Sequence, residues 1–351
     1  MKISMPLDLS RLLVLTIWYG PYAVEAWALL ILAGFAYRSR DALQSRACKQ
    51  AVSRFSAARR IFANLARRRT LAILFTGASA LAARALLLPV LPIRQPIVTD
   101  EFSYLLAADT FASGRLANPT HPMWVHFESM HILQHPTYAA MYHAAQGLIL
   151  AAGQVVAGHP WAGVYLSVAV MCALLCWMLQ GWLPPAWALL GGLVAVLRLG
   201  LFGYWINSYW GGAAAAIGGL LVLGAMPRLL RKIRLRDALL LAFGMAILAN
   251  SRPYEGLLLS IPVCVYLAVR LLKLRGPALA GAALRLVLPA ALVLAVAGAG
   301  TCYNYYRVTA NPFRMPYQVS RDQDAVARIF LWERPFPMKA DRKSTRLNSS
   351  H

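Results

Sequence analysis

The sequence predicts an all-α membrane protein that crosses the bilayer several times. Hydrophobic residues make up 59% of the 351 residues and charged residues only 14%, whereas soluble domains carry about 25% charged residues. The mean hydropathy is +0.54, and apolar runs long enough to span a bilayer recur along the chain. This composition excludes a disordered chain, which needs low hydrophobicity and high charge.

The positive charge is concentrated between the apolar runs. The net charge of +22, from 35 Lys and Arg against 13 Asp and Glu, would suggest nucleic-acid binding in a soluble protein. Here the basic residues gather at 38–70, 228–236 and 270–275, and such clusters mark the cytoplasmic loops of membrane proteins. We therefore expect membrane lipids, and no nucleic acid, as partners.

Eight apolar runs predict membrane-spanning helices whose threading puts every basic cluster on the cytoplasmic side. The shortest of them is about 14 residues, although a full crossing needs about 20. This threading requires the semi-apolar segment 136–157 not to span, so we predict an interfacial helix there. The eight runs are 12–36, 71–92, 161–182, 186–204, 211–227, 237–250, 256–272 and 279–302.

These runs divide the chain into four regions. Residues 1–70 form an extra N-terminal transmembrane helix and a basic cytoplasmic loop, and 71–302 form a membrane core with an extracytoplasmic loop at 93–160. Residues 303–340 turn polar and are expected to begin a truncated extracytoplasmic region. Residues 341–351 match the translation of a common sequencing adapter, so we expect them to be an artefact.

Two adjacent acids, Asp100 and Glu101, follow the second apolar run in the first large outer loop. Acids at the start of a helix can simply offset the helix dipole, which is the alternative to a catalytic role. Neighbouring residues on a helix point in different directions. We therefore expect only one of the two, Asp100, to face a site, where a carboxylate could exchange protons with a substrate.

Three arginines lie towards the outer side of the predicted core. Arg84 and Arg198 both lie roughly 10 Å inside the outer ends of their helices, and Arg252 lies on an outer turn. Intramembrane charges are costly and suggest function, although pairing, such as that of Arg252 with Glu255, would also explain one. Three guanidinium groups at this level suit a bound phosphate, because arginine can donate two parallel hydrogen bonds to phosphate oxygens.

Aromatic and polar residues form a predicted outer hairpin between two spans. They fit the aromatic belt at a membrane surface. Alternatively, they form the edge of a binding site in which aromatic rings stack on a sugar and polar side chains hydrogen-bond to it. The candidate substrate-binding residues, in this hairpin and near the acids and arginines, are Tyr104, Tyr204, Asn207, Tyr209, Trp210, Tyr254 and Glu255.

Histidines and cysteines give little indication of a metal. Five of the seven histidines fall between residues 121 and 143, and His126, His131 and His135 are the metal candidates among them. Only the last two have the spacing of a helical ligand pair, and no cysteine has a paired spacing. We expect no metal site and no cofactor, and the need for a divalent cation stays open.

Taken together, these features resemble the GT-C superfamily of membrane glycosyltransferases, in its protein O-mannosyltransferase-like and aminoarabinose-transferase-like branch. The resemblance covers roughly residues 71–302 and depends most on Asp100-Glu101, followed by Tyr104, Ala107 and Ala112-Ser113-Gly114. It implies transfer of a sugar from a polyprenyl-phosphate carrier to a lipid, glycan or protein acceptor on the outer face. Asp100 would then be the catalytic acid or base and Glu101 would support it.

The resemblance further implies an integral protein of the bacterial inner membrane with an extracytoplasmic active site. Residues 1–70 precede the usual first helix of the superfamily, and its C-terminal outer domain is missing. Two alternatives stay open. A transporter or flippase for a lipid-linked precursor would need charges along a path through the bilayer, and a non-catalytic assembly subunit would leave the three arginines scattered around the bundle.

Overall fold

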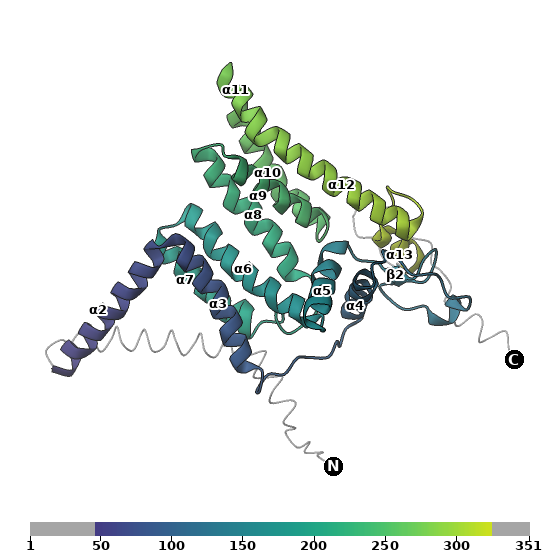
Figure 1. The fold of residues 1–351 in the computed structure, drawn as a ribbon, viewed down its shortest axis with the longest axis horizontal. Coiled ribbons are helices and arrows are strands. Elements are labelled where there is room, and N and C mark those ends of the chain that lie inside the picture. The colour runs from purple at the N-terminus through teal and green to yellow at the C-terminus, as the bar shows by residue number, and fades with distance from the viewer. Residues whose placement is uncertain (1–45, 325–351) are drawn as a thin grey trace, which may run out of the picture.

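The computed structural model describes residues 46–324, in which helices account for most of the chain (Figure 1). The predicted span at 12–36 and the regions 325–340 and 341–351 lie outside these residues. The helices are α2 (Arg46–Arg67), α3 (Arg69–Leu87), α4 (Thr99–Ala112), α5 (Ala144–Ala157), α6 (Trp161–Trp182), α7 (Pro185–Ala195), α8 (Gly212–Arg231), α9 (Leu235–Ala249), α10 (Pro253–Leu272), α11 (Pro277–Ala282), α12 (Leu288–Thr309) and α13 (Pro316–Asp324), with short helical turns η1 (Trp124–Phe127), η2 (Val196–Leu201) and η3 (Ala283–Val287).

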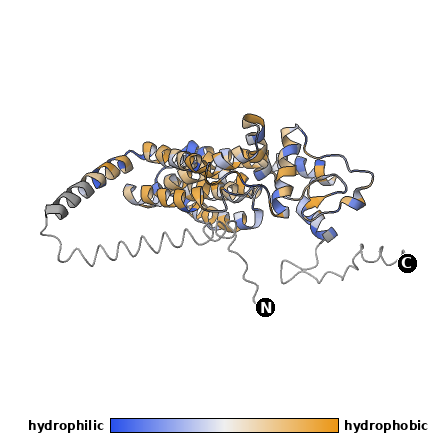
Figure 2. Cartoon of the chain, turned by 90° about the horizontal axis from the view of Figure 1, so that it is seen from below, coloured by the Kyte–Doolittle hydropathy of each residue, from blue (hydrophilic) through white to orange (hydrophobic). Residues whose placement is uncertain are grey.

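The prediction of a predominantly α-helical protein is confirmed, and several of its helices have the length and composition that crossing a membrane requires. Every apolar run predicted within the described residues is helical, and Figure 2 shows these helices to be mostly hydrophobic. Five stretches are long and apolar enough to cross a membrane, at Arg69–Leu86, Trp161–Trp182, Gly212–Arg231, Pro253–Leu272 and Pro277–Thr309. The runs predicted at 186–204 and 237–250 form shorter helices, α7 with η2 and α9.

Small residues let the helices of the bundle pack closely. A Cβ atom added at Gly153 of α5 would lie 2.2 Å from the backbone nitrogen of Gly163 in α6. A Cβ atom at Gly218 of α8 would lie 2.9 Å from the carbonyl oxygen of Gly244 in α9. Glycine at such contacts allows two backbones to approach, as is common between helices in membranes.

The predicted interfacial helix at 136–157 is wrong in its first part. The helix begins only at Ala144, and the preceding residues form an antiparallel pair between β1 (Ile132–Leu133) and β2 (Ala139–Ala140). Backbone hydrogen bonds between Asn118 and Tyr138 extend this pairing, so the backbone groups before Ala144 are satisfied without a helix. The outer loop also contains a second short helix, α4, which packs against α5.

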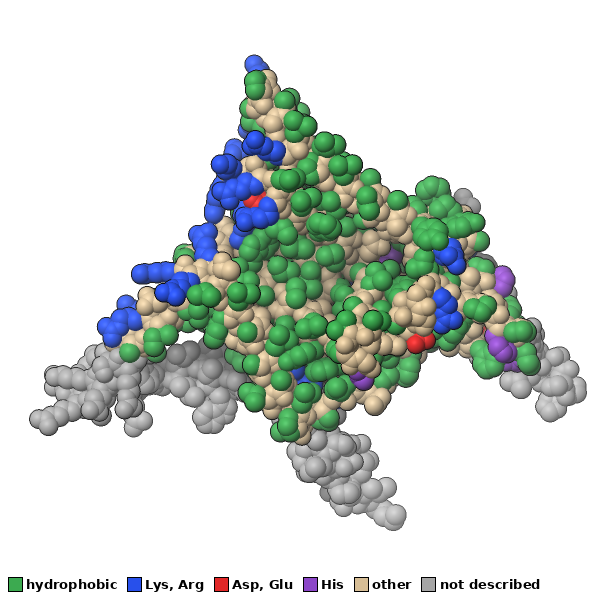
Figure 3. Space-filling model, in the orientation of Figure 1, with side chains coloured by type: hydrophobic (Ala, Val, Ile, Leu, Met, Phe, Trp, Pro, Cys, Tyr) green, Lys and Arg blue, Asp and Glu red, His purple; other side chains and the backbone are tan. Residues whose placement is uncertain are grey.

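The two ends of the bundle differ in charge. In Figure 3 the Lys and Arg side chains gather along the edge that carries α2 and the C-terminal ends of α8 and α10. The outer loop with α4 and the β1–β2 pair lies at the other end (Figure 1). There α13 covers the loop, since Val308 and Val319 pack with Leu133 and Ala139 in one buried cluster.

Candidate active site

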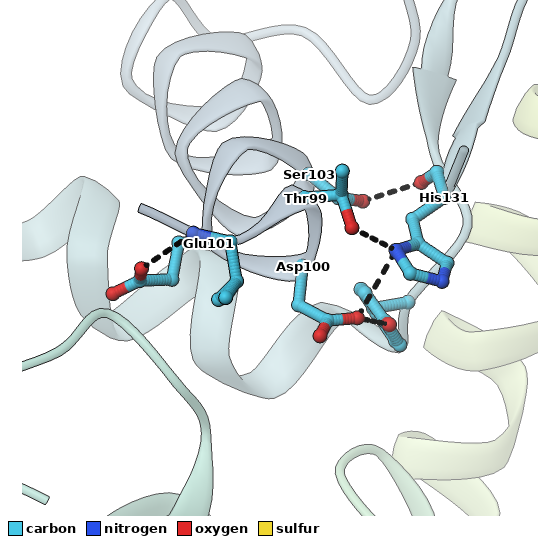
Figure 4. A network of polar contacts seen from close by, with 7 residues as sticks. Thr99, Asp100, Glu101, Ser103 and His131 are labelled. Atoms are coloured by element: carbon cyan, nitrogen blue, oxygen red, sulfur yellow. Dashed lines mark hydrogen bonds and ion pairs between the residues drawn. The ribbon is translucent and has the colours of Figure 1, made fainter. Parts of the chain in front are cut away.

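The N-terminal turn of α4 points its two acids in different directions (Figure 4). Glu101 is buried, and its carboxylate accepts hydrogen bonds from the backbone N–H groups of Ile97 (2.8 Å), Val98 (3.2 Å) and Tyr209 (3.0 Å). These bonds satisfy orphan donors at the helix start and fasten α4 to the hairpin that contains Tyr209. Glu101 is thus placed to hold Asp100 in position.

Asp100 is partly exposed and is held through one of its two oxygens. Oδ1 accepts a short hydrogen bond from the hydroxyl of Tyr142 and lies 3.1 Å from Nδ1 of His131. The Asp100 side chain is 29% exposed, and no group in residues 46–324 bonds its Oδ2. A fixed carboxylate with one open oxygen is the arrangement that a proton acceptor in catalysis needs.

His131 is itself fixed by the first turn of α4. Its carbonyl oxygen accepts a 2.6 Å hydrogen bond from Ser103, and its Nδ1 lies 3.0 Å from the hydroxyl of Thr99. Because Nδ1 faces an oxygen of Asp100, we assign the ring proton to Nδ1. His131 therefore donates from Nδ1 to the Asp100 carboxylate.

Tyrosines form one wall of the site, and a cation lies close to them. The rings of Tyr104 and Tyr142 stack with centroids 4.5 Å apart. Burial raises the pKa of Tyr104 to about 12, and the positive charge of Arg252 opposes that shift. Burial and the hydrogen bond to Asp100 raise the pKa of Tyr142 still more, so both phenols stay protonated and Tyr142 remains a donor.

The charge of Arg252 also acts on His143. Its Nδ1 is 3.0 Å from the hydroxyl of Tyr305 in α12. Burial, and next the charge of Arg252, lower the pKa of His143 to about 4. The imidazole is therefore neutral at pH 7, and it joins α5 to α12 behind the Asp100 cluster.

The shifted pKa of His143 predicts a loss of stability in mild acid. Unfolded chains protonate this histidine near pH 6.5, whereas the folded chain resists protonation until about pH 4. The free energy of unfolding should fall by about 3 kcal/mol between those pH values and level off below them. His143→Gln should remove this part of the pH dependence in thermal unfolding, whereas His121→Gln, which changes an exposed ring, should retain it. An equal slope in the two variants would contradict the assignment.

Of the three predicted arginines, Arg252 is the one whose positive charge acts on described residues of the Asp100 cluster, namely Tyr104 and His143. Arg84 is fully buried, donates to the Leu91 carbonyl (2.9 Å) and to Oδ1 of Asn207 (3.2 Å), and lies over the ring of Trp161. It therefore ties the end of α3 to the outer hairpin. Arg198 is half-buried in η2, which packs against α3.

The candidate substrate-binding residues divide by exposure. Tyr104 and Tyr209 are buried, and the Asn207 side chain is used within its hairpin, where it donates to two carbonyls. Tyr204 and Trp210 are exposed and meet edge to face, with ring centroids 5.5 Å apart. The exposed pair could stack a sugar.

The remaining members of the predicted set lie at the start of α10. Tyr254 and Glu255 are exposed, and Glu255 pairs with Arg252 at 3.5 Å. This exposed pair contributes little to stability, so Arg252 remains available to a more strongly charged anion. In the described range, no three His, Cys, Asp or Glu side chains are grouped to hold a metal, and His126 and His135 are exposed.

An apolar groove of about 550 Å³ adjoins the cluster. Its walls come from α4, α5, α8, α9 and α12, and they include Ala144, Asn250 and Asn304. These three residues are close in sequence to His143, Arg252 and Tyr305, so one end of the groove lies beside the cationic part of the site. The Oδ1 atom of Asn304 is buried and has no hydrogen-bond partner in residues 46–324.

Several residues of the site were not predicted from the sequence. Tyr142, His143 and Tyr305 were missed, as were Thr99 and Ser103 on α4. For Tyr142 and His143 the signal was the presence of tyrosine and histidine in the otherwise apolar segment 136–157. Their partners lie far away along the chain, since Tyr142 bonds a residue 42 positions earlier.

The function of this site has to be inferred from its own residues. In comparisons with known proteins, no family model, no curated protein and no solved structure matches the chain.

Proposed function

We propose that this chain is the membrane part of a glycosyltransferase that moves a sugar from a polyprenyl-phosphate carrier to an acceptor hydroxyl on the extracytoplasmic face. The observation that carries the proposal is the Asp100 carboxylate, which has one oxygen held by Tyr142 and His131 and the other open. It lies in one cluster with the cation of Arg252.

The proposed reaction is an inverting displacement at the anomeric carbon of the sugar. The acceptor oxygen forms a bond to that carbon while the bond from carbon to the carrier's phosphate oxygen breaks, and Oδ2 of Asp100 takes the acceptor's proton. Polyprenyl phosphate leaves with the electron pair. Arg252 stabilises the charge that grows on this phosphate, which is where a fixed cation lowers the barrier most.

The apolar groove suits the isoprenoid chain of such a carrier. It is about 550 Å³ in volume and is lined mainly by apolar side chains. Burying an isoprenoid tail in it would therefore be favourable. Because one end adjoins His143 and Arg252, a tail in the groove would deliver its phosphate to the Asp100 cluster. Tyr204 and Trp210 would stack on the sugar.

The proposed placement in the membrane follows from the charges. The basic edge with α2 and the C-terminal ends of α8 and α10 would face the cytoplasm by the positive-inside rule. The Asp100 cluster, at the other end of the bundle, would then face outward. We propose eight crossings in the bacterial inner membrane, in a GT-C-like arrangement that includes the run at 12–36.

Arg252→Gln should lower sugar transfer by the full-length protein about 100-fold, since it removes one cation that stabilises the leaving phosphate. Arg252→Lys should restore part of the rate because the charge is retained. The measurement is transfer from a polyprenyl-phosphate sugar in proteoliposomes. Arg115→Gln removes an exposed arginine that follows α4 and serves as the control. Equal rates in the two glutamine variants would refute the role, and translocation without transfer would favour a transporter.

A further inference from the structure

A second cavity lies at the basic end of the bundle, away from the Asp100 cluster. It has a volume of about 290 Å³ and lies between the C-terminal ends of α8 and α10 and the turn η3. Its cationic lining residues are Arg231, Lys232, Arg270 and Lys273, and its lining includes no carboxylate. The position corresponds to the end of two helices that are long enough to span a bilayer.

No described carboxylate pairs with the cationic residues that line this cavity. Lys232, Arg270 and Lys273 have no ion pair or side-chain hydrogen bond within residues 46–324, and Arg231 donates only to the carbonyl of Gly181 (2.9 Å). The nearest acid in sequence, Asp237, is buried and pairs with Arg236 at 3.3 Å. Several unpaired cations around one cavity favour an anionic ligand.

The rest of the cavity is apolar. Leu267 and Leu286 are buried in its wall, and Leu271 and Leu274 also line it. Outside, the exposed face of α10 continues as apolar surface, with Tyr266 and Val269 about half exposed. A ligand that fits both parts has an anionic head and a hydrocarbon tail, whereas a free phosphate would leave the leucines without a partner.

We propose that this cavity binds the head group of an anionic phospholipid, with the acyl chains lying along α10. Basic pockets between the ends of membrane helices are suited to such head groups. The cavity lies at the C-terminal ends of α8 and α10, which belong to the edge where Lys and Arg gather in Figure 3. The bound lipid joins the end of α8 to the end of α10, and it is distinct from the substrate of the Asp100 site.

Native mass spectrometry of the full chain with added phosphatidylglycerol tests the proposal. The triple variant Lys232→Gln, Arg270→Gln, Lys273→Gln should bind this lipid about 100-fold more weakly, because each cation near a head group strengthens binding about fivefold. The control is Arg59→Gln, Arg60→Gln, Arg275→Gln, which removes three exposed charges from the same end of the protein. It should bind within about twofold of the original chain.

Equal losses of lipid affinity in the two triple variants would overturn the proposed site, because they would show nonspecific electrostatic attraction of the lipid to the basic surface. Binding of phosphatidylcholine as tight as that of phosphatidylglycerol would also overturn it. Competition by soluble glycerol 3-phosphate at the affinity of the lipid would show a phosphate site without a lipid. If the triple variant does not fold, Lys232→Gln and Lys273→Gln are tested singly, each with an expected loss of about fivefold.

Discussion

Asp100→Asn is expected to lower sugar transfer by the full-length protein about 1000-fold without unfolding it. The amide cannot take the acceptor's proton, and general base catalysis contributes 10²- to 10⁴-fold. The amide oxygen can still accept from Tyr142 and His131 in the place of Oδ1. The thermal unfolding midpoint should therefore stay close to that of the original chain, and the loss should appear in kcat.

Asp109→Asn is the matched control, because Asp109 lies on the same helix and is exposed. Among the described residues its carboxylate accepts a hydrogen bond from Gln154 alone, at 3.4 Å, and we expect an unchanged rate. Full transfer activity in the Asp100→Asn protein would remove the catalytic role of this residue. A loss of rate accompanied by a large drop in the unfolding midpoint would show instead that Asp100 is structural.

The helices could be predicted from the sequence because a spanning helix is a local property of an apolar run. The runs at 161–182 and 256–272 correspond within a few residues to α6 and α10. The outer loop could not be predicted in the same way. Residues 136–143 carry the composition of a helix, but pairing with residues 118 and 132–133 satisfies their backbone groups instead.

The site was only partly predictable for a related reason. Helical geometry was enough to predict that Asp100 and Glu101 point in different directions. Depth along a helix was not enough to place Arg84, because depth says nothing about which way a side chain turns around the helix axis. The charge of Arg252 acts on Tyr104 because the turn that precedes α10 is tied to the start of α5, where the N–H of Ala145 donates to the carbonyl of Asn250 (3.0 Å), and Arg252 and Tyr104 are about 150 residues apart in the sequence.

Arg84→Met is expected to lower the free energy of unfolding by about 3 kcal/mol. The methionine fills part of the space but leaves the Leu91 carbonyl and Oδ1 of Asn207 without their donor, and removing one partner of a buried charged hydrogen bond costs about this much. The contact with the Trp161 ring is also lost. The measurement is thermal or denaturant unfolding of the purified protein in detergent.

The same variant separates the two roles considered for Arg84. If Arg84 only ties α3 to the outer hairpin, transfer should fall in step with the folded fraction, and Arg84→Lys should recover part of the stability, since a lysine can bond one of the two acceptors. Arg94→Met, an exposed arginine just beyond α3, should change neither quantity. An Arg84→Met protein that unfolds normally but has lost transfer would show that this guanidinium binds the phosphate after all. Its burial against Trp161 and its hydrogen bonds to two protein oxygens favour the structural outcome, since Nη1 and Nη2 each have a partner and Nε has none among the described residues.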